Sequence, residues 1–290
     1  MVYYSPFLCI FAVEINKIQS YMKISIISIN YNNADGLNKT IESVIDQTYK
    51  DFEFIVIDGG STDGSVDIIK KHTTNISYWI SEPDNGIYHA MNKGIKVANG
   101  DYCIFINSGD SLYDNKVLQR FNSYNSDKDI IIGRVFSLQT NSALFLPPNR
   151  DLSLYHLFSS TVPHQGTFIK TSLQKKYPYD ESLKIVADWK FFLVAIIMHN
   201  CSIEYTEFPV SKYDTGGISS TNSRATQEEK NRVLEQLFPP RLLADYLWLK
   251  NSECKTLSLM PEIKKHYRID LLLYKIGKFL LKILYKHDRC

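Results

Sequence analysis

The sequence predicts an α/β protein with a mostly parallel, doubly wound sheet, and three observations favour this class. Short apolar runs rich in β-branched residues alternate with amphipathic helical stripes, which is typical of parallel strands covered on both faces. The loops between these segments are short. Two of the apolar runs end abruptly in acidic residues and glycines, at Asp58-Gly59 and at Asp110. Sheets of this class bind their ligands at the carboxyl ends of the strands.

Strands and helices are expected to alternate through the first half of the chain. The β-branched apolar runs predict strands at Lys23–Ile29, Phe52–Ile57, Ile76–Ile80 and Tyr102–Ile106. Apolar residues at helical spacing predict helices at Leu37–Tyr49, Val66–Ile69 and Ile87–Ala98. Asp63 is expected to cap the second helix at its N-terminus, and Gly100 to follow the third as a C-cap glycine.

The second half has a mixed pattern. It predicts strands at Ile130–Phe136 and Ile203–Val210, an extended Pro147-Pro148 segment, and helices at Leu152–Phe158 and Val186–His199. We therefore expect one domain at residues 22–238, with a first half at about 22–126 and a second half at about 127–238. We expect Met22 to be the natural start and residues 1–21 to be a spurious or poorly ordered extension, which is left out of the fold prediction. Residues 239–290 form a separate basic helical tail.

The composition describes an ordinary folded protein. Of the 290 residues, 44% are hydrophobic and 22% are charged. The net charge is only +2, so no overall field favours nucleic acid. Residues 241–290 nevertheless carry 11 basic and 5 acidic side chains, which suggests contact with an anionic surface. The five cysteines are scattered, which suits a reducing compartment and argues against a zinc site.

Asp58 and Asp110 are the acidic residues at the two strand ends. The Asp58 carboxylate could accept the imide N–H of a uracil ring, or it could only organise the glycine turn that follows it. Asp110, with Asn107 as a second or water-mediated ligand, is the best candidate for holding Mg²⁺ or Mn²⁺. Such a cation needs few protein ligands when the phosphates of a substrate supply the others. The alternative is an ordinary Asn-Ser-Gly-Asp turn.

Asp188 stands at the entrance of a very apolar helical segment. An isolated carboxylate beside Trp189 and Phe191 should have its ionisation perturbed by desolvation, as suits a general base. The alternative is a helix N-terminal acid favoured by the macrodipole. His164 and Gln165 are kept as acceptor-site candidates, although a lone histidine is more often structural. The glycine loop at residues 215–220 could close over a ligand.

The tail mixes apolar residues with lysines that fall at helical spacing, at Lys275, Lys278, Lys282 and Lys286. This composition favours an amphipathic helix at a membrane surface, and the alternative is a helix packed on the body with a solvated lysine stripe.

Several of these segments resemble family 2 glycosyltransferases, which have the GT-A fold. The resemblance is carried by Ile24–Asn32, by the helix ending in Gln47-Thr48-Tyr49, by Phe54–Gly64 and by the strand ending at Asp110. The stretch Ser81–Ile95, with the sequence SEPDNGIYHAMNKGI, resembles more narrowly the colanic-acid-type transferases that build bacterial cell-surface polysaccharides. The resemblance covers about residues 22–220 and does not extend to the tail. It implies that the domain at 22–238 is catalytic, with a nucleotide-binding half at about 22–126 and an acceptor half at about 127–238.

The resemblance implies a set of site residues. Asp188 matches the family's general base, and Asp110 matches the end of its Asp-x-Asp metal motif. Donor-binding positions are implied for Tyr31, Asn32, Asp58, Asp84, Asn92 and Lys93. The sequence departs from the family pattern where acidic residues are usual, at Asn107, Gly109, Ala187 and His89.

The resemblance also implies a reaction. We expect an inverting glycosyltransferase that moves a sugar from a nucleotide-diphosphate sugar, UDP-linked by preference, to a hydroxyl of a lipid-linked glycan. The expected location is cytoplasmic, peripheral on the inner face of the membrane, with no nucleic-acid partner. The alternative is a non-catalytic member of an assembly complex that binds nucleotide sugar or glycan. A nucleotidyltransferase is disfavoured, because no glycine-and-arginine phosphate loop lies near the first strand.

Overall fold

A computed structural model describes residues 22–145, 152–215 and 223–257. The N-terminal extension, the Pro147-Pro148 segment, most of the glycine loop and the lysine-rich tail segment lie outside the described residues, so these expectations stay predictions. The chain divides into two compact units, Met1–Lys230 and Asn231–Cys290. The first unit carries the sheet. The second contains the end of α9 (Ser223–Leu237) and α10 (Pro240–Leu257).

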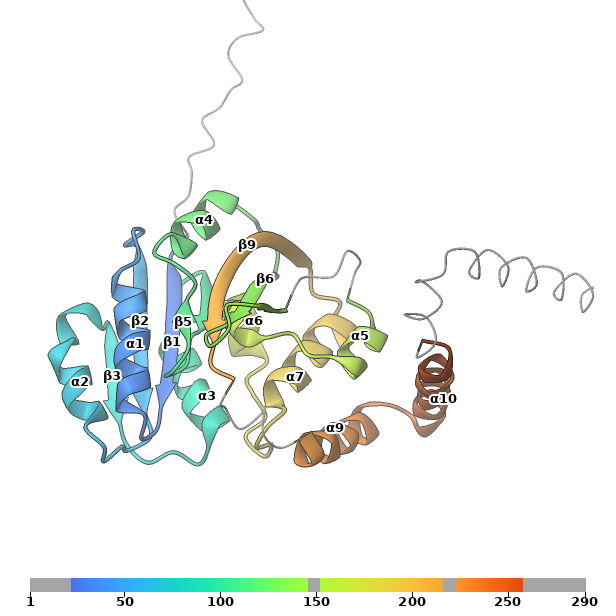
Figure 1. Cartoon of the computed structure of the whole chain (residues 1–290). Coiled ribbons are helices and arrows are strands. Elements are labelled where there is room, and N and C mark those ends of the chain that lie inside the picture. Colours follow the sequence, from blue (N-terminus) through green and yellow to red (C-terminus); the bar gives the residue numbers. More distant parts are fainter. Residues whose placement is uncertain (1–21, 146–151, 216–222, 258–290) are drawn as a thin grey trace, which may run out of the picture. The chain divides into compact units, whose positions relative to one another are not determined.

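The sheet begins with four parallel strands, as the sequence predicts. They are β1 (Ile24–Asn30), β2 (Phe52–Asp58), β3 (Tyr78–Ser81) and β4 (Tyr102–Phe105), in the spatial order β3-β2-β1-β4. The neighbouring strands β3, β2 and β1 are labelled in Figure 1. Asn30 is in register with Asp58, and Asp58 with Ser81. The carboxyl ends of these neighbouring strands therefore meet at one edge of the sheet.

The sheet continues as a mixed half, in the order β8-β6-β9-β5. β8 (Thr167–Lys170) pairs antiparallel with β4 and with β6 (Ile130–Ser137), whereas β6 and β9 (Ile203–Tyr213) are parallel. The short strands β5 (Ser111–Leu112) and β7 (Ala143–Phe145) add to β9 and β6. The predicted α/β class, with a parallel first half and a mixed second half, is thus confirmed.

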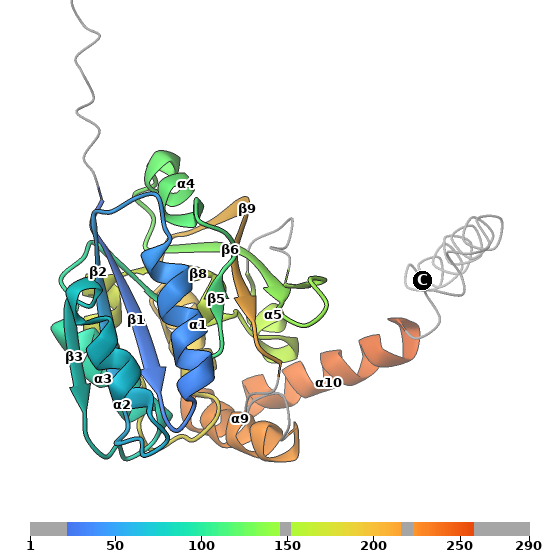
Figure 2. The same cartoon turned by 60° about the vertical axis from the view of Figure 1, so that its left-hand side comes forward.

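Helices cover both faces of the parallel strands. Alternate residues of a strand point to opposite faces. Ile24 and Ile26 of β1 pack in one cluster with α1 (Ala34–Ile45) and α4 (Val117–Tyr124), and α1 lies along β1 in Figure 2. Ile27, on the opposite face, meets α3 (Ile87–Val97) at Gly94. The remaining described helical segments are α2 (Ser65–Lys71), η1 (Thr73–Asn75), α5 (Leu154–Ser159), η2 (His164–Gly166), α6 (Thr171–Lys176), α7 (Ala187–Phe192) and the π-helix η3 (Leu193–Met198).

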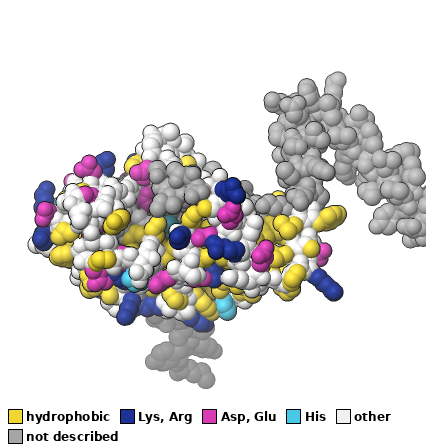
Figure 3. Space-filling view, turned by 90° about the horizontal axis from the view of Figure 1, so that it is seen from below, with side chains coloured by type: hydrophobic (Ala, Val, Ile, Leu, Met, Phe, Trp, Pro, Cys, Tyr) yellow, Lys and Arg dark blue, Asp and Glu magenta, His cyan; other side chains and the backbone are white. Residues whose placement is uncertain are grey.

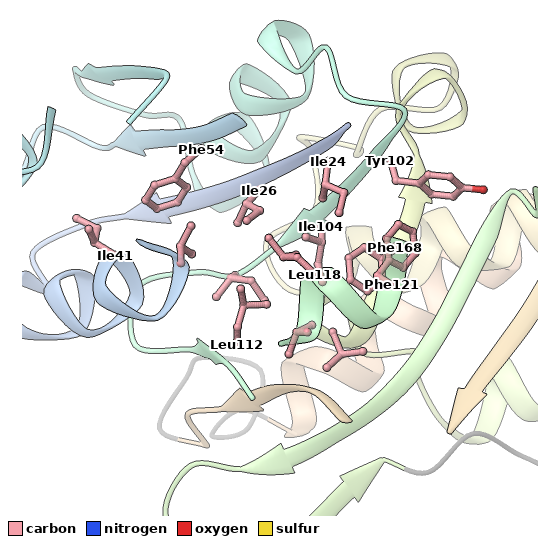
Figure 4. Packing of buried hydrophobic residues seen from close by; sticks show 14 of the residues in the cluster. Ile24, Ile26, Ile41, Phe54, Tyr102, Ile104, Leu112, Leu118, Phe121 and Phe168 are labelled. Carbon is pink, nitrogen blue, oxygen red and sulfur yellow. The ribbon is translucent and has the colours of Figure 1, made fainter. Parts of the chain in front are cut away.

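Aromatic residues join the two halves of the sheet in one core. The Phe121 ring of α4 stacks on Phe168 of β8 with centroids 3.7 Å apart, and Tyr102 of β4 meets Phe121 edge-on at 5.2 Å. Figure 4 shows these rings beside Ile104 and Leu118. Because β8 is the first strand of the mixed half, this contact holds the predicted acceptor half against the nucleotide half.

Two predicted caps are wrong. Helix α3 has Ala98 as its C-cap, with extended backbone angles. Gly100 instead donates its N–H to Ser25 Oγ at 2.8 Å, and a Cβ there would lie 2.6 Å from the Ser25 nitrogen. The N-cap position of α2 is occupied by Gly64, at φ 98°. Asp63 accepts the N–H groups of Ser65 and of Ala34, and so ties together the starts of α2 and α1.

Two predicted helices also differ in extent. The first ends at Ile45 rather than at Tyr49, and the segment predicted as one helix at 186–199 divides into α7 and the π-helix η3. Periodicity alone does not distinguish i→i+4 from i→i+5 hydrogen bonding.

The surface carries mixed charge. On the face drawn in Figure 3, acidic, basic and apolar side chains are interspersed, as the small net charge predicts. None of the described helices is long and apolar enough to cross a membrane.

We expect Gly94→Ala to destabilise the protein. An added Cβ would overlap the Cγ2 methyl of Ile27, where α3 lies directly against β1. Overpacking of this kind costs about 1–3 kcal/mol. Urea unfolding would show a lower midpoint, while Lys96→Ala on the exposed side of the same helix serves as the control. An unchanged midpoint for Gly94→Ala would contradict the close packing of α3.

Candidate functional site

A cavity of about 800 Å³ opens at the carboxyl ends of the parallel strands. This volume is within the range of small-molecule sites. Seven of the sequence-predicted residues line it, namely Tyr31, Asp84, Asn107, Asp110, His164, Gln165 and Asp188. The structure thus brings both strand ends, the residues of η2 and the start of α7 into one site.

Thr40 of α1 and Asn33, the N-cap residue of α1, hold the Asn107–Asp110 turn by hydrogen bonds. The Thr40 hydroxyl, fully buried, donates to the backbone oxygen of Asp110 at 2.6 Å and accepts the N–H of Gly109 at 3.1 Å. Asn33 Nδ2 donates to the backbone oxygen of Ser108 at 3.2 Å. Gly109 has φ 102°, a conformation in which other residues are strained. The turn is therefore rigidly placed, and Gly109 has a backbone reason for replacing an acid.

Asp110 is a buried carboxylate with few compensating contacts. Only 4% of the residue is exposed, and Oδ1 accepts the N–H of Asp214 at 2.9 Å. Burial raises the pKa of Asp110 to about 7, and the nearby Asp214 charge acts in the same direction. Contacts with His164 and Gln165 act against this rise. A positive charge at this point would stabilise the ionised carboxylate.

Asn107, in the same turn, supplies a second side-chain oxygen. Its Oδ1 is buried and has no hydrogen-bond partner, while Nδ2 lies 3.3 Å from Nε2 of His164. Within the described ranges no group of three or more His, Cys, Asp or Glu residues could hold a metal ion. Asp110 and the Asn107 oxygen therefore fit a cation whose other ligands come from a substrate.

Carboxylates dominate the charge of the described cavity lining. Asp84, Asp110, Asp188 and Asp214 stand against the single lysine Lys184. An anionic ligand such as a diphosphate would be repelled by this lining unless a cation accompanied it.

Asp58 lies behind the cavity wall rather than in it. The residue is fully buried, and its Oδ1 accepts from Asn30 Nδ2 at 2.7 Å and from the Ser61 hydroxyl at 2.6 Å. Oδ2 accepts from the Ser61 N–H and the Ser81 hydroxyl. Burial acts to raise the pKa of Asp58, but these hydrogen bonds outweigh it and lower the pKa. The structure therefore shows the turn-organising role, and contact with a base stays a prediction.

Tyr31 and Asp84 flank Gly59 at the cavity wall. Tyr31 is 69% exposed, and a Cβ on Gly59 would lie 3.1 Å from its ring and 3.2 Å from Asp84 Oδ2. Asp84 is held by Lys93, whose Nζ is 2.6 Å from Oδ1. A glycine is needed here because a side chain would fill the slot between the aromatic ring and the carboxylate.

Besides Asp58, three more predicted donor-binding residues are not among the cavity-lining residues. Asn32 braces the loop after β2 by accepting the N–H of Thr62 at 2.9 Å. Asn92 exchanges two hydrogen bonds of 2.9 Å with the backbone of Tyr179. Lys93 pairs with Asp84 and with Glu82. Each supports residues near the cavity, so direct contact with a donor stays a prediction.

The sequence predicts an isolated carboxylate at Asp188. In the structure Asp188, at the start of α7, is instead surrounded by hydrogen-bond donors. Oδ2 receives His164 Nδ1 at 2.9 Å, and Oδ1 receives the Trp189 N–H at 2.9 Å and the Tyr88 hydroxyl at 3.1 Å. Burial acts to raise the pKa of Asp188, but these contacts, with His164 the largest, lower the pKa. Desolvation does not decide its ionisation, and the carboxylate is kept charged.

Sequence reasoning missed four residues around this site. Tyr88 and Lys184 line the cavity, and Glu229 of α9 accepts the N–H groups of Lys184 and Ile185, each at 2.9 Å. No local signal connects Glu229 with a segment 45 positions earlier. Asp214 did carry a signal, because it is a third acid that follows a predicted strand, Ile203–Val210, by only a few residues.

Burial of Asp110 should make the protein less stable as pH rises. The folded pKa of about 7 lies above the ordinary value of 3.8, so stability is lost between about pH 4 and pH 7. That difference corresponds to at most about 4 kcal/mol. With chelator present, Asp110→Asn should unfold at a higher temperature than the wild type at pH 8. The advantage should shrink toward pH 4, and a constant difference across this range would contradict the burial effect.

Comparisons with known proteins agree with this geometry. The family model for Glycosyl transferase family 2 matches residues 25–182. An uncharacterized glycosyltransferase of Mycobacterium tuberculosis is 33% identical over 204 residues, covering 68% of this chain and 77% of the relative. A PGL/p-HBAD biosynthesis glycosyltransferase of Mycobacterium bovis is 31% identical over 212 residues, covering 68% and 79%. These relatives do not single out the colanic-acid-type subset.

Solved structures share the fold. Staphylococcus aureus TarS (residues 1–349), in complex with UDP-GlcNAc, has a TM-score of 0.60 at 19% identity, covering 73% of this chain and 64% of that one. The mannosyltransferase PcManGT of Pyrobaculum calidifontis, in complex with GDP-Man and Mn²⁺, has a TM-score of 0.52 at 14% identity, covering 70% and 60%. The chain thus spans less than two thirds of these solved structures. With its parallel sheet, its strand-end cavity and a family match over more than half its length, the chain belongs to glycosyl transferase family 2 and is a glycosyltransferase.

Proposed function

We propose that this glycosyltransferase inverts the anomeric centre while moving a sugar from a nucleotide-diphosphate sugar, UDP-linked, to an acceptor hydroxyl. One observation carries the proposal: a single cavity is lined by the Asn107–Asp110 turn and by Asp188. Inversion needs one carboxylate on the acceptor side and charge stabilisation at the leaving diphosphate. The turn and Asp188 have the chemistry for these two tasks.

The donor is proposed from the cavity wall and from related folds. TarS binds UDP-GlcNAc and PcManGT binds GDP-Man in their solved complexes. In this chain the exposed ring of Tyr31 offers a stacking surface for a base, next to the slot at Gly59. Asp84 on the other side of the slot offers a carboxylate to ribose or base donors.

A divalent cation, Mg²⁺ or Mn²⁺, would be held by Asp110 and the Asn107 oxygen together with the donor phosphates. Bound there, it would supply positive charge to the leaving diphosphate. The unpartnered Asn107 Oδ1 and the carboxylate-rich lining support this assignment. Asp110 itself would become fully ionised beside the cation.

Asp188 is proposed as the general base. Its side chain is 18% exposed and lines the cavity, and its three hydrogen-bond donors keep the carboxylate charged and oriented. It would take the proton of the acceptor hydroxyl as that oxygen attacks the anomeric carbon. His164 and Gln165 would line the acceptor side.

The acceptor class rests on composition and resemblance. We propose a lipid-linked glycan of cell-surface polysaccharide synthesis, of the kind used by colanic-acid-type transferases. The basic segment 241–290 would attract an anionic membrane surface, so the protein would work as a peripheral protein at the inner face.

Asp188→Asn should nearly abolish transfer. A general base contributes on the order of a hundred- to ten-thousand-fold, and asparagine keeps the shape of aspartate without its basicity. UDP release from a panel of UDP-sugars with glycan acceptors would measure the loss, and UDP binding by thermal shift should persist. Asp67→Asn, an exposed acid in the first turn of α2, is the matched control. Wild-type rates in Asp188→Asn would remove Asp188 from the mechanism.

Donor hydrolysis should depend on a divalent cation. Added Mn²⁺ should stimulate UDP release by the wild type, and a chelator should suppress it. Asp110→Asn should lose most of the stimulation, together with the extra thermal stabilisation that Mn²⁺ gives in the presence of UDP. If the protein bound UDP-sugars yet released no UDP under any condition, it would be the non-catalytic binder instead.

A further inference from the structure

We propose that His164 is a positioning residue that acts through Asp188, donating its Nδ1–H to Oδ2 so that the charged carboxylate keeps one orientation toward the acceptor. This inference rests on the proposed function, in which Asp188 is the base. It goes further by giving His164 a definite part in the reaction in place of a general acceptor-site position.

The contact is short, buried and brought together from distant segments. His164 belongs to η2, before β8, and Asp188 begins α7, 24 residues later, with 2.9 Å between Nδ1 and Oδ2. Their side chains are only 13% and 18% exposed. The His164 ring meets the Phe105 ring edge-on at 6.2 Å. A hydrogen bond to a charged group in such a setting is worth more than a neutral one.

Neither ring nitrogen of His164 is placed to act as the base itself. Nδ1 faces a carboxylate, so it carries a hydrogen. Nε2 lies 3.3 Å from Asn107 Nδ2, an amide nitrogen that only donates, so the Nε2 lone pair accepts that bond. This tautomer leaves Asn107 Oδ1 without a partner, as the structure has it, and so available to a cation. The hydrogen bonds from Asn107 to His164 and from His164 to Asp188 are thus compatible with one tautomer of His164.

Among the described contacts, no other polar group donates a hydrogen bond to Asp188 Oδ2. The Tyr88 hydroxyl is shared between the Ile185 oxygen at 2.6 Å and Asp188 Oδ1 at 3.1 Å, so its bond to Asp188 is the weaker of the two. Tyr179 interacts with the charge of Asp188, and because burial raises the pKa of Tyr179, its phenol is neutral. The Asp110 charge interacts with His164 from the other side. Oδ2 therefore depends on His164.

Loss of the His164 donor should shift the pKa of Asp188 in a defined direction. Burial raises the pKa of the Asp188 carboxyl and the His164 hydrogen bond lowers it. Without that hydrogen bond, the pKa of Asp188 therefore rises. Only the ionised Asp188 carboxylate can take the proton of the acceptor hydroxyl. Activity that falls as pH decreases through this pKa will therefore fall at a higher pH when the donor is removed.

Three variants test the proposal. His164→Leu removes the donor. His164→Asn places an amide N–H near the position of Nδ1 but cannot act as a base. Tyr88→Phe removes the weaker hydroxyl contact and serves as the matched comparison. The readouts are the pH profile of kcat/KM for UDP release and the ¹³C NMR titration of the Asp188 carboxyl, assigned by its absence in Asp188→Asn.

We expect His164→Leu to lower kcat/KM at neutral pH by about 10- to 100-fold, as loss of a hydrogen bond to a charged group predicts. Its acid limb and its Asp188 titration should both move to higher pH. His164→Asn should recover most of the rate and the titration. Tyr88→Phe should move both in the same direction by a smaller amount. In the wild type, ¹⁵N NMR should show His164 protonated at Nδ1.

Four results would overturn the proposal. They are an Asn variant as inactive as the Leu variant, an Asp188 titration that does not move in His164→Leu, a His164 without a hydrogen at Nδ1, and wild-type transfer by Asp188→Asn. The last would also reject the proposed function, and the titration would then still report whether the two side chains interact. Should His164→Leu fail to fold, the wild-type ¹⁵N spectrum and the His164→Asn profile decide the question.

Discussion

The parallel register of β1 with its neighbours β2 and β4 is the constraint on which the rest of this structure depends. Because the three strands run the same way, their carboxyl ends reach one edge of the sheet. Thr40 of α1, the helix that follows β1, then fixes the turn after β4 by hydrogen bonds to Gly109 and Asp110. The candidate cation site is therefore built by β1 and α1 as much as by its own residues.

Much of the fold and part of the site could be predicted from local sequence. The β-branched runs predicted the parallel strands, since such residues suit strands buried on both faces. Asn107 and Asp110 could be found because they follow a strand directly, and a strand end in this class faces the ligand. Asp188 and His164 could be selected by residue type, but their mutual contact could not be predicted from a separation of 24 positions.

Local sequence does not reveal partners that are distant along the chain. Asp58 has the composition of a ligand-binding acid, yet Asn30 and Ser81, from the strands on either side, satisfy its oxygens. Asn92, predicted to lie beside the donor, also fixes the backbone of Tyr179, 87 residues later. Gly100 follows a helix, but its lack of a side chain serves the contact with Ser25. Composition does not reveal which neighbour satisfies a polar group.

The contact between Glu229 and the segment before α7 has a consequence for how the site is assembled during synthesis. The buried Glu229 carboxylate holds the backbone of Lys184 and Ile185, and the Ile185 oxygen in turn receives the Tyr88 hydroxyl. The family match ends at residue 182, before this anchor. A nascent chain can thus form its parallel strands and its cation-site turn early. The hydrogen bonds from Glu229 to the wall beside Asp188 can form only after α9 has left the ribosome.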